Sequence, residues 1–138
     1  MSHLSTLGAR EIQWKMKTLR IMCKLAKQIG LQWELKEDSK SFNWYKGRTA
    51  CDAELEVGAV YSIGVKKVAG NGGVTLEQDF YRHGGLSQAV GDQGAKLKQL
   101  YRAAVTLETS QEDFSKNFSF KAVQEKNQAG WFELDIQA

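Results

Sequence analysis

The stretch that decides the fold is AVYSIGVKKVAGNGGVTLEQDFY, residues 59–81. Its outer parts, 59–69 and 74–81, are short and rich in apolar and β-branched residues, which is typical of β-strands. GNGG (70–73) stands between them, and Asn-Gly between two such runs is the strongest short signal for a hairpin. The stretch therefore predicts an antiparallel strand pair.

On both sides of this hairpin the sequence contains further stretches with helical or strand-like spacing of apolar residues. Helices are predicted over 11–29, where apolar residues recur at spacings of four and three and Gly30 ends the run, and over 86–107, where Gly91 and Gly94 weaken the first half. Further strands are predicted over 3–7, 31–36, 42–47, 49–57, 117–123 and 130–136. This order predicts a two-layer α+β fold, with two helices packed on one face of a mainly antiparallel sheet, layered as in a ferredoxin-like sandwich.

The composition is that of an ordinary globular protein. The chain has 138 residues, 42% hydrophobic and 25% charged, which fits a single α+β domain over 1–138. No apolar run approaches the ~20 residues of a membrane span, and the start lacks a secretory pattern. Cys23 and Cys51 are the only cysteines and have no CxxC spacing, so we expect buried free thiols, no metal and no cofactor. We expect a soluble cytoplasmic protein.

Positive charge is concentrated on the first predicted helix. The net charge is +3, but the segment 10–27 alone carries six cations against the single anion Glu11. Ile12, Met16, Leu19, Cys23 and Ala26 share the side that should face the sheet. The cations on one flank of that helix are Lys17, Arg20, Lys24 and Lys27.

A second apolar stripe lies roughly opposite the expected core side of this helix, formed by Trp14, Ile21 and Leu25. A surface helix needs only one apolar stripe, so the second is either covered within the fold, by a terminal segment or by residues 109–116, or exposed as a contact surface. In the second case the three residues are apolar anchors, and the neighbouring cations attract a protein partner with an acidic surface.

Two other kinds of site compete with this hypothesis. Trp44, Tyr45, Lys46 and Arg48 offer aromatic rings and cations for single-stranded nucleic acid, although no RNP-like motif accompanies them. A thiol enzyme would need Cys23 or Cys51 beside His83, the only histidine besides His3.

The acidic residues of the stretch 49–57 alternate with apolar ones. Asp52, Glu54 and Glu56 are expected on the solvated face of a strand.

Several short motifs are spread over nearly the whole length of the chain. They are MSHLST at the start, YKG (45–47), the Cys51-Asp52 step, YSIG (61–64), LEQDF (76–80) and KLKQLYRAAV (96–105). Together they resemble a small family of conserved chloroplast reading frames (Ycf type, number thirty-five), a domain of unknown function shared by plastids, cyanobacteria, bacteria and phages. The chain departs from that pattern at Ser62, where the family has Asp, and at Cys51, where it has Ala.

The resemblance implies an accessory role, because members of the family are often encoded near AAA+ ATPases. Together with the residues, it predicts a non-enzymatic adaptor or inhibitor that docks on a larger protein assembly. A homo-oligomer is compatible with the same surface. The alternatives are a single-stranded nucleic-acid-binding module and a small enzyme with a Cys/His site.

Overall fold

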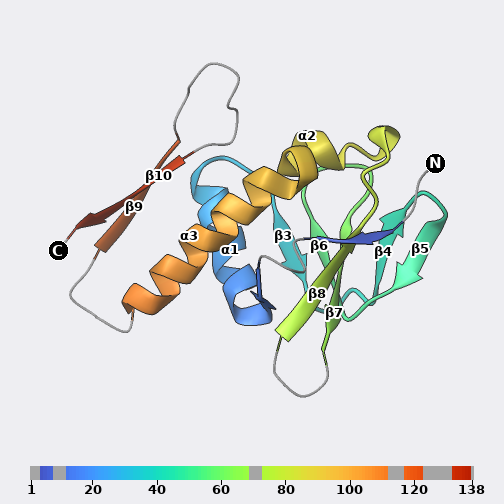
Figure 1. Ribbon diagram of the computed structural model, residues 1–138, viewed down its shortest axis with the longest axis horizontal. Helices are drawn as coiled ribbons and strands as arrows, with labels where there is room; N and C mark the ends of the chain where they lie inside the picture. The colour runs from blue at the N-terminus through green and yellow to red at the C-terminus, as the bar shows by residue number, and fades with distance from the viewer. Residues whose placement is uncertain (1–3, 8–11, 69–72, 112–116, 123–131, 138) are drawn as a thin grey trace.

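The fold is given by a computed structural model that describes residues 4–7, 12–68, 73–111, 117–122 and 132–137 (Figure 1). Strands and helices follow one another in the order β1 (Ser5–Thr6), β2 (Trp14–Lys15), α1 (Met16–Gln28), β3 (Glu34–Lys36), β4 (Ser41–Trp44), β5 (Gly47–Ala50), β6 (Ala53–Glu56), β7 (Ile63–Lys67), β8 (Gly73–Gln78), the 3₁₀ turn η1 (Arg82–Gly84), α2 (Leu86–Val90), the 3₁₀ turn η2 (Asp92–Gly94), α3 (Ala95–Gln111), β9 (Asn117–Ala122) and β10 (Phe132–Gln137).

The main sheet is antiparallel and has the order β1-β8-β7-β6-β3, with β2 also paired to β8. The predicted hairpin is confirmed, since Val65 faces Leu76 and Lys67 faces Val74 across β7 and β8. Its Asn-Gly turn falls in 69–72, outside the described residues. Consecutive strands β6, β7 and β8 are neighbours, so the short hairpin connections set the sheet order.

The first helix is shorter than predicted at its beginning. Trp14 and Lys15 are extended, because they pair with Val74 and Gly73 of β8, and α1 starts only after them. The predicted end is confirmed: Gly30 has a left-handed φ of +85°, which any other residue would adopt only with strain. The second predicted helix is interrupted at the two glycines that weakened it, and α3 begins after them.

One apolar core joins both long helices to one face of the sheet. α1 and α3 lie against each other on that face (Figure 1). Ile63 and Val65 of β7 belong to this core, whereas Gly64 between them faces the other way. The predicted α+β class, with two long helices on one sheet face, is therefore confirmed. The fold shares the layering of a ferredoxin-like sandwich but not its strand order.

The opposite face of the sheet carries the β4–β5 hairpin. Phe42 of β4 is fully buried there, outside the main core cluster. A Cβ atom on Gly64 would lie 2.3 Å from the Phe42 ring, so only glycine lets the hairpin approach β7 this closely. The sequence predicted residues 42–47 as one strand, but the chain turns at Tyr45 and Lys46 and pairs Trp44 with Gly47.

The two predicted C-terminal strands are confirmed, but they form an antiparallel pair of their own and do not join the main sheet. The pairing begins with Asn117 opposite Gln137 and ends with Ala122 opposite Phe132. Within it, Phe118 pairs with Ile136 and Phe120 pairs with Leu134. Their connection, 123–131, lies outside the described residues.

Candidate functional site

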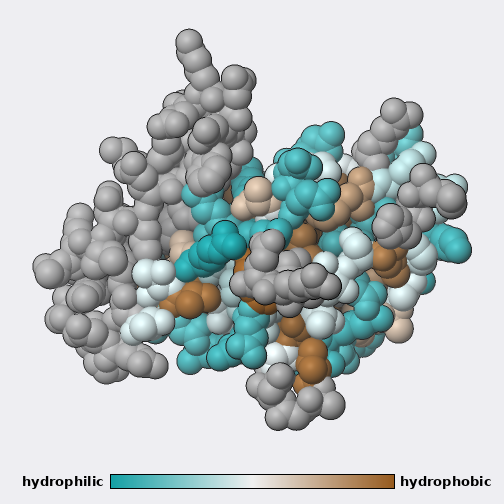
Figure 2. Space-filling view, in the orientation of Figure 1, coloured by the Kyte–Doolittle hydropathy of each residue, from teal (hydrophilic) through white to brown (hydrophobic). Residues whose placement is uncertain are grey.

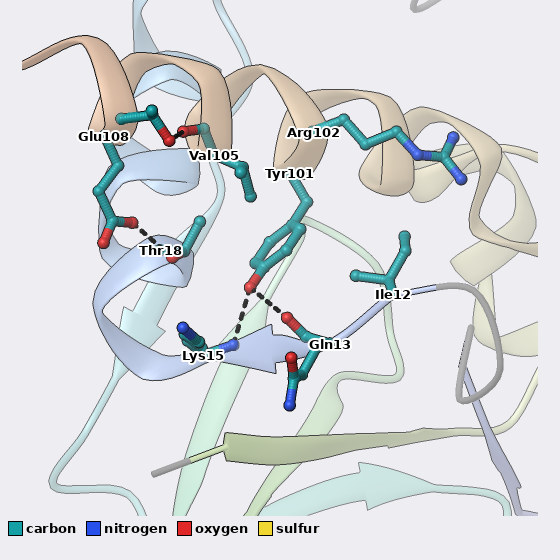
Figure 3. A pocket seen from close by; sticks show the side chains of 9 residues that line it. Ile12, Gln13, Lys15, Thr18, Tyr101, Arg102, Val105 and Glu108 are labelled. Carbon is teal, nitrogen blue, oxygen red and sulfur yellow. Dashed lines mark hydrogen bonds between the residues drawn. The ribbon is translucent and has the colours of Figure 1, made fainter. Parts of the chain in front are cut away.

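A groove of about 490 Å³ opens between β2, the start of α1 and the C-terminal half of α3 (Figure 3). Figure 2 shows apolar surface, in brown, among hydrophilic residues over that part of α3. The residues that line the groove are Ile12, Gln13, Lys15, Thr18, Tyr101, Arg102, Val105, Glu108 and Thr109.

Tyr101 forms the floor of the groove and ties α3 to β2. Its hydroxyl accepts a hydrogen bond from the backbone N–H of Lys15 at 2.8 Å and donates one to the carbonyl of Gln13 at 2.9 Å. Its ring meets the edge of Trp14, with centroids 4.5 Å apart. Burial raises the pKa of Tyr101, so the phenol stays neutral and keeps both hydrogen bonds.

The walls of the groove combine charge with exposed apolar surface. Val105 is 42% exposed, and Ile12, across the Tyr101 ring from it, is half-buried (Figure 3). Lys15 and Arg102 are exposed cations. Glu108 is the one acid among the lining residues, and its carboxylate accepts a hydrogen bond from Thr18 at 2.6 Å. The groove therefore combines two cations and one acid with an apolar centre.

The predicted basic residues lie on the solvent face of α1, and Lys17 at the start of that helix adjoins the groove. Lys17, Arg20, Lys24 and Lys27 are all exposed. Lys17 approaches Glu108 at 3.9 Å. Arg20 donates two hydrogen bonds to Glu37, which raises the pKa of Arg20 and lowers that of Glu37.

The predicted apolar anchors are not exposed, and this part of the hypothesis is wrong. Trp14 and Leu25 are only 2% and 3% exposed, and Ile21 is partly buried against the core. Among the described residues the cover is α3, which packs along α1. Of the segment 109–116 that was considered as a cover, residues 109–111 belong to α3, and 112–116 lie outside the described residues. The second stripe is core because α1 is packed from two sides.

The predicted nucleic-acid residues come together on the β4–β5 hairpin, but in unequal roles. Tyr45 is 58% exposed and Lys46 is exposed at the tip, with its Nζ atom 5.9 Å from the centroid of the Trp44 ring. The indole of Trp44 donates to Thr49 at 2.6 Å. Arg48 is engaged structurally, because its guanidinium donates to Ser41, Asn43 and Glu54.

Glu54 was expected on a solvated face and is instead 5% exposed beneath this hairpin. Its carboxylate accepts hydrogen bonds from Ser62 at 2.6 Å, from Ser39 at 2.8 Å and from Arg48 at 3.2 Å. Burial alone would raise the pKa of Glu54, but these hydrogen bonds outweigh it and hold the pKa below its usual value. Sequence alternation missed this, because a polar residue in a strand gives no sign of which face a later hairpin covers.

Neither cysteine is placed as an activated nucleophile. Cys23 is 6% exposed, and burial raises its pKa to about 12. Cys51 is only partly buried, so the prediction of a buried thiol is confirmed for Cys23 and not for Cys51. Partial burial still raises the pKa of Cys51. A reactive thiol needs a lowered pKa, so both environments disfavour the Cys/His alternative. Among the described residues, no group of three or more His, Cys, Asp and Glu side chains could hold a metal ion.

We therefore expect Cys23 to be unreactive in the folded protein at neutral pH. In a Cys51→Ser variant, the remaining thiol should react with Ellman's reagent far more slowly in buffer than in denaturant, because the thiolate is scarce and the sulfur is covered. Rapid labelling of the folded variant would contradict this and return Cys23 to consideration as a nucleophile.

Comparison of the chain with protein-family models, with curated proteins and with solved structures finds no match. The resemblance to the chloroplast reading frames thus stays a prediction. In the described part of the chain, no helix combines the length and apolar character that crossing a membrane requires.

Proposed function

We propose that this protein is a non-enzymatic accessory or inhibitor protein that docks on an acidic segment of a protein partner through the groove between β2 and α3. The observation that supports this best is the groove itself, which exposes the apolar Val105 and is also lined by the cations Lys15 and Arg102. Protein interfaces combine an apolar centre with a polar rim in this way.

The partner is expected to bind through its side chains. An edge strand often recruits a partner strand through free backbone groups. Here the N–H of Lys15 and the carbonyl of Gln13 are already bonded to Tyr101, so strand addition along this part of β2 is disfavoured. An aliphatic side chain against Val105 and Ile12, flanked by carboxylates, fits the groove best.

The basic face of α1 (Lys17, Arg20, Lys24 and Lys27) extends the positive surface beyond the groove. Exposed ion pairs each contribute only about 0.2–1 kcal/mol, so this face mainly speeds association with an acidic partner. An AAA+ ATPase assembly, which the family resemblance implies, is one kind of partner that this proposal includes.

The proposal is tested by selecting short random peptides on the immobilised protein and measuring the affinity of the consensus peptide by fluorescence polarisation. We expect acidic residues around an aliphatic one. Val105→Asp and Lys15→Glu should each weaken binding about tenfold or more, equivalent to about 1.4 kcal/mol, because they add negative charge to the groove.

Two variants elsewhere on the surface serve as matched controls. Val60 is 71% exposed and Lys67 is exposed, and neither lines the groove, so Val60→Asp and Lys67→Glu should bind like the wild type. A consensus without acidic residues, or controls that weaken binding as much as the groove variants, would overturn the proposal.

A further inference from the structure

A second surface, separate from the groove, gathers aromatic rings from two distant parts of the chain. Tyr45 at the tip of the β4–β5 hairpin meets Tyr81, with centroids 5.4 Å apart, and Tyr81 meets His83 at 5.0 Å. Tyr45 is 58% exposed, His83 is exposed and Tyr81 is half-buried between them. The sequence pattern indicates Tyr45 and His83 for two different sites, a nucleic-acid surface and a thiol enzyme, and gives no sign that their rings lie close together.

The position of these rings is fixed by the backbone around them. The N–H of Tyr81 donates to the Asp79 carboxylate at 2.9 Å, and Asp79 is buried. The N–H of Gly84 donates to the carbonyl of Tyr81 at 2.9 Å, and the N–H of Tyr61 donates to the carbonyl of Gly84 at 3.0 Å. A Cβ atom on Gly84 would lie 2.0 Å from the Tyr61 ring, so the turn lies flat on that ring.

The hairpin tip that carries Tyr45 is positioned by a tight turn and by contacts of Trp44. The turn at Tyr45 and Lys46 has only two residues between the paired Trp44 and Gly47. The indole of Trp44 is bonded to Thr49, and Lys46 extends over its ring. Because Tyr45 and His83 both pack against Tyr81 before any ligand binds, we expect a ligand that stacks on these rings to cost little additional side-chain entropy.

We propose that Tyr45, Tyr81 and His83 form a stacking surface for an unpaired nucleic-acid strand, with Lys46 contacting its phosphates. Exposed aromatic rings beside a cation are the combination by which proteins bind single strands without reading sequence. Arg48 adds little, since its guanidinium is held by Ser41, Asn43 and Glu54. Binding should accordingly depend more on stacking than on charge.

The test is fluorescence anisotropy with labelled oligo(dT) and oligo(U), and with a duplex of mixed sequence. We expect both single strands to bind and the duplex to bind more weakly. Tyr45→Ala should weaken single-strand binding on the order of tenfold, because stacking contributes about 1–3 kcal/mol per base. Lys46→Ala should reduce the slope of log affinity against log salt by about 0.7, the value for one phosphate contact.

Matched controls separate this surface from the groove. Val68→Ala and Lys67→Ala remove an exposed apolar group and an exposed cation at the end of β7, and Val105→Asp alters the groove. All three variants should keep single-strand binding at the wild-type level. Absence of binding at low salt, equal binding by Tyr45→Ala, or a preference for the duplex would overturn the inference. Tyr45→Ala should leave acidic-peptide binding unchanged, so the two proposals can fail independently.

Discussion

Trp14→Ala is expected to lower the free energy of unfolding by about 4 kcal/mol, the range found when a large buried side chain is truncated. Trp14 is 2% exposed, and its ring packs edge-on against Tyr101 with centroids 4.5 Å apart. Its indole N–H donates to the carbonyl of Leu7 at 2.8 Å. The truncation therefore removes packing and leaves a buried carbonyl without its donor. Urea unfolding followed by circular dichroism measures the loss.

Two comparisons make this result decisive. Trp14→Phe keeps most of the packing and loses the hydrogen bond, so it should cost only about 1–2 kcal/mol. Val105→Ala, on the exposed side of α3, should change stability by less than about 0.5 kcal/mol. Wild-type stability of Trp14→Ala would contradict the structure and restore Trp14 as an exposed anchor.

Glu54→Ala is expected to lower the free energy of unfolding by about 3 kcal/mol, because removing one partner of a buried charged cluster leaves the others unsatisfied. Arg48, Ser39 and Ser62 all donate to this carboxylate. They come from β5, from the chain before β4 and from the chain before β7, so the loss should loosen the β4–β5 hairpin from the sheet. Urea unfolding of the variant beside the wild type measures the change. Unchanged stability would show that the cluster contributes nothing.

The same carboxylate predicts a pH dependence of stability. The pKa of Glu54 is lower in the folded state than its ordinary value of 4.5, so its contribution is present above that value and is lost as the pH falls through the folded-state pKa. The wild type should therefore lose stability below about pH 4.5 more steeply than Glu54→Gln. Glu37→Gln is the control and should follow the wild-type pH profile closely, because Glu37 and Arg20 form an exposed ion pair that solvent screens. Parallel profiles for the wild type and Glu54→Gln would contradict this prediction.

The elements that sequence predicted well are those defined by local signals. Asn-Gly between two strand-like runs gave the β7–β8 pair, and Gly30 gave the end of α1. The start of α1 was missed because Trp14 and Lys15 are held extended by β8, nearly sixty residues away in the chain, and no capping residue marks the change. Helical spacing alone cannot reveal such a long-range pairing.

In the sites, too, features set by local sequence were predicted, and features set by contacts between distant segments were missed. The exposure of Lys17, Arg20, Lys24 and Lys27 follows from helical spacing and is confirmed. Trp14 and Leu25 were assigned to the surface because spacing shows that a helix has two apolar sides but does not show that a second helix covers one. The groove around Tyr101 and the contact of Tyr45 with Tyr81 are each formed by segments that are distant in the sequence. No local sequence pattern predicts them.

The most direct test of the docking proposal is an amide chemical-shift map of the ¹⁵N-labelled protein, recorded while the selected acidic peptide is added. The largest shifts are expected around the groove, at Lys15, Tyr101, Val105 and their neighbours, with smaller ones along the solvent face of α1. Shifts centred on the β4–β5 hairpin, or spread evenly over the surface, would contradict the assignment of the groove as the docking site.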